Sequence, residues 1–294
     1  MLTLSTDQLS TQEIQKYLQY AIAPRPICFA STIDLEGNVN LSPFSFFNAF
    51  GANPPILIFS PALRGRDGAT KNTLDNIKDI KECVVNIVDY KMVQQMSLSS
   101  CEYPKGTDEF IKSGFTPQKA TMVAPPMVKE SKIKLECKVN QVIPLGTEGG
   151  AGNLVLAEVL VMHIDESVLN ADNMIDQTKL DLVARLGSNW YARINNASLF
   201  EVTKPNTELG IGFDGLPPSI RNSAVLSGND LGQLANVHVL PSIDPAYHDE
   251  NLKNIIQYFS IQPEEMEKEL HLYAKQLLAE GKTKEAWQIL LASV

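Results

Sequence analysis

The chain has no apolar run that approaches the roughly 20 residues needed to span a bilayer. Its first 20 residues are polar and amphipathic, without the basic start and apolar core of a signal peptide. Cations are also few, because 25 Lys and Arg stand against 34 Asp and Glu and no long basic run occurs. These absences argue against membrane and nucleic acid as partners and predict a soluble, cytoplasmic protein.

Cysteine and histidine are scarce as well. The four cysteines lie far apart, form no C-x-x-C pair and predict reduced, packed thiols in a chain of this length. The four histidines have no metal-ligand spacing with one another or with the cysteines, so no metal site is expected. With 294 residues, 44% of them apolar, the chain can form one large core or two smaller ones.

Short β-strands dominate the first 200 residues. A turn at residues 34–38 joins two of them into a predicted hairpin. Residues 56–59 form a continuous apolar run, which predicts a strand buried on both faces. The predicted strands are 27–33, a run that starts at Val39, 56–59, 83–88, 131–142 and 153–164. Between them lie only short helices, a pattern typical of a β-barrel with helical decoration.

The composition changes after about residue 200. Residues 251–259, 263–280 and 283–292 are predicted helices, with Pro263 at a first helical position and Gly281 as a stop. Between residues 227 and 240 no periodicity is clear. The sequence therefore predicts two domains: a barrel over residues 1–200 and a mainly helical extension over residues 201–294. A packing, dimerisation or partner-binding role for this extension stays open.

The stretch Leu41–Asn48 combines three phenylalanines with two serines and an asparagine. Phe46 and Phe47 are adjacent, so they cannot face the same core if the chain is extended. One interpretation is a core strand that runs into a turn at Asn48. The other is an apolar wall with hydrogen-bonding groups, suited to a planar ligand with polar edges.

Residues 64–73 form a loop with glycines, cations and hydroxyls before a predicted helix. Free N–H groups at such a helix start favour an anion, and Arg64 and Lys71 could add charge-assisted bonds. Thr70 or Thr73 is the expected N-cap. The order G-x-x-x-x-G-K-[ST] is absent, so this is no P-loop. The alternative is a solvated surface turn.

Five ordered segments resemble the flavin reductase-like family, whose members have an FMN-binding split barrel. They are Pro24–Ile27 with Ser31-Thr32, Asn40–Asn48, Phe59–Pro61 with Asp67-Gly68, Lys71–Ile77, and Ala184–Gly187 with Tyr191. The resemblance covers roughly residues 10–200. The family usually has Lys-Asp-Thr where this chain has Lys71-Asn72-Thr73. The implied fold is mainly β, a split β-barrel with helical decoration and an α-helical C-terminal extension.

The resemblance implies an FMN site and its residues. The expected cofactor-binding residues are Arg25, Ser42, Phe44, Ser45, Phe46, Phe47, Asn48, Ser60, Arg64, Lys71 and Thr73. The residues expected on the substrate side are His163, Arg185 and Tyr191. One of Phe46 and Phe47 should face the core and the other the ligand or a partner subunit. Three of these residues have an alternative interpretation. Arg25 could be a solvated loop residue, His163 a hydrogen-bonded histidine at the end of a strand, and Tyr191 a core residue.

The implied activity is that of an NAD(P)H-dependent flavin reductase, which passes electrons to free flavin or to a partner such as an oxygenase. The flavin carries the chemistry, so no catalytic side chain is expected. The family usually places the site between two subunits, which implies a homodimer. The alternative is a flavin-binding sensor or interaction module without turnover, because a reductase needs only the barrel.

Overall fold

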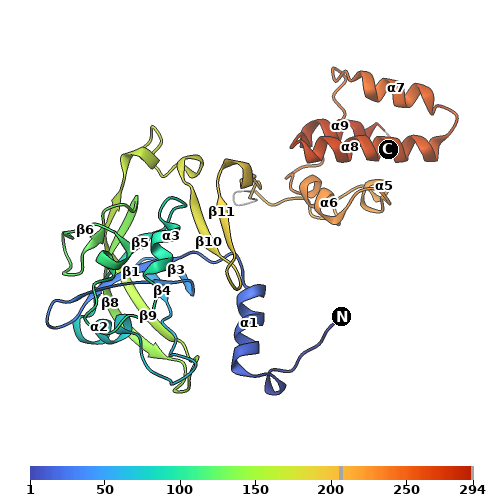
Figure 1. Ribbon diagram of the computed structural model, residues 1–294. Coiled ribbons are helices and arrows are strands. Elements are labelled where there is room, and N and C mark those ends of the chain that lie inside the picture. Colours follow the sequence, from blue (N-terminus) through green and yellow to red (C-terminus); the bar gives the residue numbers. More distant parts are fainter. Residues whose placement is uncertain (205–207, 293–294) are drawn as a thin grey trace. The chain divides into compact units, whose positions relative to one another are not determined.

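The computed structural model describes residues 1–204 and 208–292 and divides into two compact units, Met1–Leu199 and Phe200–Val294 (Figure 1). Within the predicted extension 201–294, residues 205–207 and 293–294 lie outside the described residues. In the part of the chain that the structure describes, no helix has both the length and the apolar character needed to cross a membrane.

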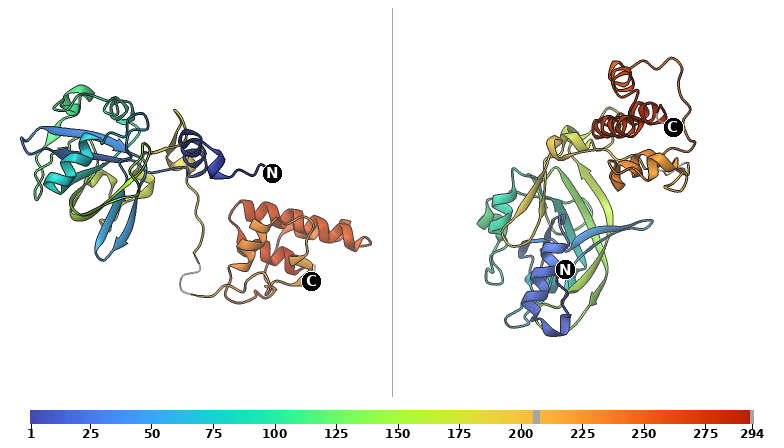
Figure 2. Two further views of the ribbon diagram at one scale, coloured as in Figure 1. Left: turned by 90° about the horizontal axis from the view of Figure 1, so that it is seen from below. Right: turned by 90° about the vertical axis from the view of Figure 1, so that its right-hand side faces the viewer.

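The first unit contains a seven-stranded antiparallel sheet whose order is β2-β1-β5-β8-β9-β4-β3 (Figures 1 and 2). Its strands are β1 (Cys28–Ile33), β2 (Val39–Phe44), β3 (Phe47–Ala52), β4 (Pro55–Phe59), β5 (Glu82–Ile87), β8 (Ile133–Pro144) and β9 (Asn153–Ile164). Strands β2 and β3 stand at opposite ends of this order, yet only Ser45 and Phe46 separate them in the chain. The sheet therefore curls until its two end strands meet at this bend.

Alternation along the strands produces two cores on opposite faces of the sheet. We call them the inner and the outer cluster. In β1, Cys28 and Ala30 belong to the inner cluster, whereas Phe29 belongs to the outer one. Helix α2 (Asn72–Ile80) packs on the inner cluster, and α3 (Val93–Leu98) with α4 (Glu109–Ser113) packs on the outer one. A site near α2 and a site near α3 are thus separated by the sheet.

Smaller elements complete the first unit. Helix α1 (Thr11–Ala21) begins with a capping box formed by Ser10 and Glu13. The remaining elements are β6 (Pro117–Gln118), β7 (Met127–Val128), β10 (Leu182–Arg185), β11 (Tyr191–Ile194) and the 3-10 turns η1 (Thr6–Gln8), η2 (Glu166–Val168), η3 (Gln177–Lys179) and η4 (Asn196–Ser198).

A buried carboxylate covers part of the sheet edge at β2. Glu109 is the first residue of α4, and its Oε2 accepts the backbone N–H of Leu41 at 3.0 Å. Burial raises the pKa of Glu109, an effect that the bond from Leu41 partly opposes. One backbone donor of the edge strand is in this way occupied by a side chain.

Three local predictions were wrong. In β4 only Leu57 and Phe59 are buried, so this strand has one covered face rather than two. For residues 178–184 the sequence predicts a short helical turn, but only η3 is helical, and β10 follows it to form a hairpin with β11. Neither Thr70 nor Thr73 caps α2, whose N-cap position is Lys71 without a side-chain bond.

The second unit is helical, as predicted. It consists of α5 (Pro218–Arg221), α6 (Gly228–Ala235), α7 (Glu250–Tyr258), α8 (Pro263–Ala279) and α9 (Thr283–Leu291). Its own core includes Leu234, Leu270 and Trp287. Pro263 begins α8, and Gly281 has a φ of 75°, a conformation that glycine adopts without strain at a helix end. Helix α6 lies in the segment where the sequence showed no periodicity.

Candidate functional site

Two cations meet beside the inner cluster, where α2 begins. Lys71 Nζ lies 5.5 Å from the centroid of the Phe44 ring. Burial lowers the pKa of Lys71; Glu102 raises it in part, and the charge of Arg64 lowers it again. Among the described residues, neither Arg64 nor Lys71 forms an ion pair or a side-chain hydrogen bond. A half-buried ammonium beside a guanidinium, neither of them in a direct ion pair among the described residues, has the charge and the donors that bind an anion.

The loop before α2 holds these cations in place. The N–H of Arg64 donates to the carbonyl of Ala69 at 2.9 Å, and that of Gly68 donates to the carbonyl of Arg64 at 2.8 Å. No side chain caps α2, so its first N–H groups face the same region as Lys71. We call Ser60, Arg64, Lys71 and the first turn of α2 the cationic corner. Ser60 Oγ accepts the N–H of Asn153 at 3.1 Å, which leaves its hydroxyl proton available.

Thr73 was expected to bind phosphate through its hydroxyl, and the structure places that hydroxyl elsewhere. The side chain is 1% exposed, and its Oγ1 accepts a hydrogen bond from Asn40 Nδ2 at 3.3 Å. The hydroxyl of Thr70 donates instead to Asp75 at 2.9 Å. Thr73 therefore contributes to the cationic corner through its place in the first turn of the helix, and its side chain ties α2 to β2.

The buried Arg25 side chain connects several main-chain segments through hydrogen bonds, and we call this set of contacts the Arg25 clamp. Arg25 is 6% exposed, and its guanidinium donates to the carbonyls of Gln19 and Ile22 at 2.5 Å and of Leu186 at 2.9 Å. A fourth, longer bond of 3.5 Å reaches Ser45 Oγ. Burial lowers the pKa of Arg25, and the charge of Arg185 lowers it further. The expectation of Arg25 as a direct flavin ligand needs correction, since main-chain carbonyls occupy most of its donors.

The bend between β2 and β3 separates the phenylalanines. Phe47 packs against the inner cluster, whereas Phe46 is 40% exposed and has the Arg25 guanidinium 5.9 Å from its ring centroid. Phe44 is buried, with its ring centroid 5.5 Å from that of Phe59, so it can support a ligand only from behind. Ser42 and Ser45 are half-buried, and Asn48 is exposed with its Oδ1 bonded to the N–H of Ala49 at 2.8 Å.

His163 lies apart from the other predicted residues. Its Nε2 is 2.6 Å from Oε1 of Glu136, a carboxylate that is 0% exposed. The same carboxylate accepts backbone N–H groups at 2.7 Å from Thr121, 2.5 Å from Met122 and 3.1 Å from Val123. Burial by itself would raise the pKa of Glu136, but these bonds and His163 outweigh it and lower the pKa. The contacts of His163 in the described residues therefore fit a structural role.

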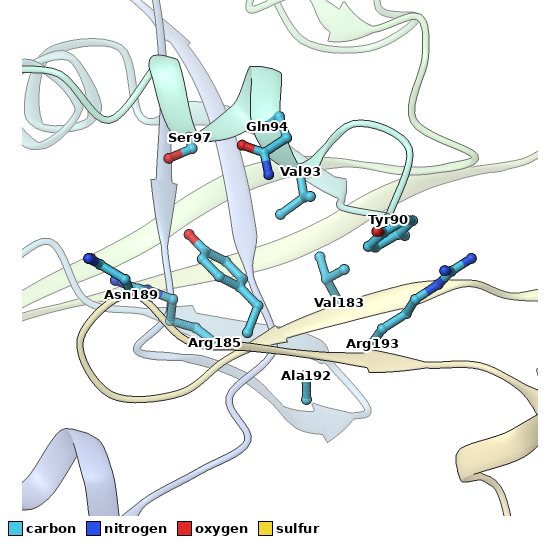
Figure 3. A pocket seen from close by; sticks show the side chains of 10 residues that line it. Tyr90, Val93, Gln94, Ser97, Val183, Arg185, Asn189, Ala192 and Arg193 are labelled. Atoms are coloured by element: carbon cyan, nitrogen blue, oxygen red, sulfur yellow. The ribbon is translucent and has the colours of Figure 1, made fainter.

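Arg185 and Tyr191 do lie together, in a cavity of about 330 Å³ between α3 and the β10–β11 hairpin (Figure 3). The Arg185 guanidinium stands 4.6 Å from the centroid of the Tyr191 ring. The cavity is lined by Tyr90, Val93, Gln94, Ser97, Val183, Arg185, Asn189, Tyr191, Ala192 and Arg193. The residues from α3 were not predicted, because an exposed glutamine and serine on a six-residue helix carry no sequence signal. The cavity borders the outer cluster through Val93 and Val183.

Comparison with known proteins identifies the family. The model of the flavin reductase like domain matches residues 20–180, which is more than half of the chain. The chain belongs to the flavin reductase-like family. The uncharacterized protein BH2278 of Halalkalibacterium halodurans is 36% identical over 204 residues, which are 69% of this chain and 96% of that protein. The uncharacterized protein YwrF of Bacillus subtilis is 29% identical over 209 residues, which are 70% of this chain and 100% of that one.

Solved structures agree with this assignment of the fold. Nitrilotriacetate monooxygenase component B from Bacillus cereus has a TM-score of 0.64 and 29% identity, covering 69% of this chain and 98% of its own. A protein with a split barrel domain from Shewanella frigidimarina has a TM-score of 0.59 and 25% identity. The match covers 69% of this chain and 100% of that protein. The predicted split barrel is thus confirmed, and membership of this flavin reductase family supports a flavin cofactor and a flavin-related oxidoreductase activity.

Proposed function

We propose that this flavin reductase-like protein binds FMN and acts as an NAD(P)H-dependent flavin reductase. The observation that carries the proposal is the cationic corner, where Arg64 and a half-buried Lys71 lie together and form no direct ion pair among the described residues. A phosphomonoester with about −1.5 to −2 charges at neutral pH balances two such cations. The residues present therefore fit the phosphate end of FMN.

The rest of the cofactor would follow the chain from this corner to the bend. Phe44 lies next to Lys71, and Ser42 and Ser45 flank it with half-buried hydroxyls. These hydroxyls and nearby main-chain groups suit the polar edge of the flavin ring, while Phe46 supplies exposed apolar surface. Arg25 would position the ring indirectly, because it fixes Ser45, the end of α1 and the β10–β11 turn.

When bound, FMN supplies the group that accepts hydride from NAD(P)H and passes electrons on. The protein's own task is then to bind and orient the cofactor and the nicotinamide, and it needs no proton-transferring side chain. The electron acceptor is free flavin or a partner oxygenase. Similarity to a protein named as a monooxygenase component supports the second choice.

A homodimer with the flavin site between its subunits forms part of this proposal. Phe46, in the bend before β3, is 40% exposed, and Phe50, within β3 at one end of the sheet order, is 65% exposed. Exposed aromatic surface of this kind is typical of an interface. Light scattering on the purified protein checks the oligomeric state, and a monomer at micromolar concentration would contradict it.

A second candidate function is that of a flavin-binding sensor or interaction module without turnover. The helical unit supports this alternative, because residues 200–294 have a core of their own and lie beyond the segment matched by the family model. Such a unit could bind a partner when the flavin state changes.

Two measurements decide between these functions. Titration with FMN should quench flavin fluorescence at a stoichiometry of one per chain, and no binding at micromolar protein would contradict both. The FMN-loaded protein is then mixed with NADH and with NADPH in the absence of oxygen. Loss of the yellow colour supports the reductase, whereas an unchanged spectrum with both nucleotides supports the module without turnover.

A further inference from the structure

The cavity between α3 and the β10–β11 hairpin has no acidic residue in its lining, although the protein has a net charge of −9. Its charged members are two arginines. Arg193 is balanced, because it bonds the carboxylate of Asp181 at 2.7 and 2.9 Å. Arg185 is not, since the one side-chain hydrogen bond described for it goes to the carbonyl of Trp190 at 3.2 Å. One guanidinium therefore remains available to an anion.

Arg185 is held ready to bind. Its backbone N–H donates to the carbonyl of Arg25 at 2.8 Å and its carbonyl accepts the N–H of Arg25 at 2.9 Å, so its main chain is fixed. Its guanidinium stacks at 4.6 Å on Tyr191. A stacked guanidinium keeps its N–H edge free and loses little entropy when it binds a carboxylate with two parallel bonds. Figure 3 shows Arg185 and Asn189 on the hairpin opposite Gln94 and Ser97 on α3.

The other residues that line the cavity indicate the chemistry of the rest of the ligand. Val93 and Val183 are buried side chains at the cavity, and the rings of Tyr90 and Tyr191 border it. Apolar and aromatic walls favour a flat apolar body, while the amides and hydroxyl at the rim favour polar substituents. A volume of about 330 Å³ lies at the small end of the range for ligand pockets and suits a ligand with one ring.

We propose that this cavity is a second binding site, which takes a small aromatic carboxylate with its carboxylate on Arg185. It is separate from the cationic corner, because the cavity borders the outer cluster whereas Phe44 beside Lys71 belongs to the inner one. The cavity therefore lies away from the proposed phosphate position, and failure of benzoate to bind there would leave the proposed flavin function standing.

The test is calorimetric titration of the full-length protein with benzoate and 4-hydroxybenzoate. Both should bind with one site per chain. Benzamide lacks the charge and cyclohexanecarboxylate lacks the aromatic ring, so both should bind at least about tenfold more weakly. Saturation with FMN should leave the benzoate affinity unchanged. Competition between benzoate and FMN, or no benzoate binding up to about 5 mM, would overturn the proposal.

Two variants locate the site. Arg185→Gln should weaken benzoate binding about ten- to a hundredfold, since one charge-assisted contact is lost. Lys91→Gln is the matched control, because it removes one positive charge next to Tyr90 from a side chain outside the lining. It should change the affinity less than about twofold if contact rather than general charge decides. Equal effects of both variants would refute the assignment to Arg185.

A third variant covers the case in which Arg185→Gln unfolds, as a thermal melt would show. Ser97→Phe adds volume at an exposed position of α3 that lines the cavity. It should abolish benzoate binding while FMN binding stays unchanged. Benzoate binding that survives Ser97→Phe would place the ligand elsewhere.

Discussion

His163 Nε2 on strand β9 lies 2.6 Å from Oε1 of Glu136 on the neighbouring strand β8. The carboxylate of Glu136 also receives three consecutive N–H groups from residues 121–123. A single buried anion thus fixes a stretch of main chain that has no strand or helix of its own. Its removal should affect stability and leave the flavin site intact.

The first prediction concerns acid stability. The pKa of Glu136 is lower in the folded than in the unfolded protein. The Glu136 carboxylate therefore stabilises the fold fully above the unfolded pKa of about 4.3, and this stabilisation is lost as the pH falls through the folded pKa. Glu136→Gln should lower the stability at pH 7 by about 1.5–3 kcal/mol, because charged hydrogen bonds are replaced. Its melting temperature should also fall less than that of the wild type between about pH 5 and 3.

Thermal melts across this pH range provide the measurement. Glu166→Gln, at an exposed position, is the control and should follow the wild type. His163→Gln should leave the FMN affinity within about twofold, since His163 faces Glu136. A large loss of FMN affinity in His163→Gln would restore the histidine to the flavin site.

The second prediction concerns the cationic corner. Lys71→Met and Arg64→Met should each weaken FMN binding about ten- to a hundredfold, because each removes one charge-assisted bond to phosphate. The affinity of the wild type should also decrease with added salt. Lys78→Met, at an exposed position in the last turn of the same helix, should bind FMN like the wild type. An equal loss of FMN affinity in Lys78→Met would mean that net charge, and not contact with the phosphate, decides the affinity.

The third prediction concerns the Arg25 clamp. Arg25→Met would leave three carbonyls without their donor and should cost on the order of 3 kcal/mol of stability. Denaturant unfolding measures this loss, and Arg66→Met, whose side chain is 65% exposed, should cost much less. Unchanged stability of Arg25→Met would show that the guanidinium is available to a ligand after all.

The fourth prediction concerns a close approach between the hairpin turn and α1. A Cβ added at Gly187 would lie 2.5 Å from the ring of Tyr20, so the ring must move away. Gly187→Ala should destabilise the protein by about 1–3 kcal/mol through overpacking. The double variant Tyr20→Ala with Gly187→Ala should lose less than the sum of the single variants, which denaturant unfolding of all four proteins would show. Additive losses would mean that the two residues do not touch.

Local chemistry explains which parts the sequence could predict. The cationic corner was visible because Arg64, Lys71 and a helix start lie within ten residues of one another and match a family motif. Helix α8 of the second unit was visible because Pro263 marks its start and Gly281 follows its end. Both signals are short-range, and both agree with the fold.

Long-range contacts explain the errors. Glu136 alternates with Lys134 and Lys138 along β8, a pattern typical of a solvated face, but the N–H groups of residues 121–123 bond its carboxylate and bury it. The sequence also contains no sign that Arg25 donates to the carbonyl of Leu186, which lies 161 residues further along the chain. The β10–β11 hairpin was missed because each of its strands has only four residues.

The hydrogen bond between Glu109 and Leu41 affects whether another strand can pair with the edge strand β2. The edge strand β2 could in principle recruit a strand from another molecule, since unpaired N–H groups invite such pairing. The Glu109 carboxylate occupies the N–H of Leu41, and a foreign carbonyl would have to displace a buried side chain to reach it. Strand addition through the N–H of Leu41 is therefore blocked.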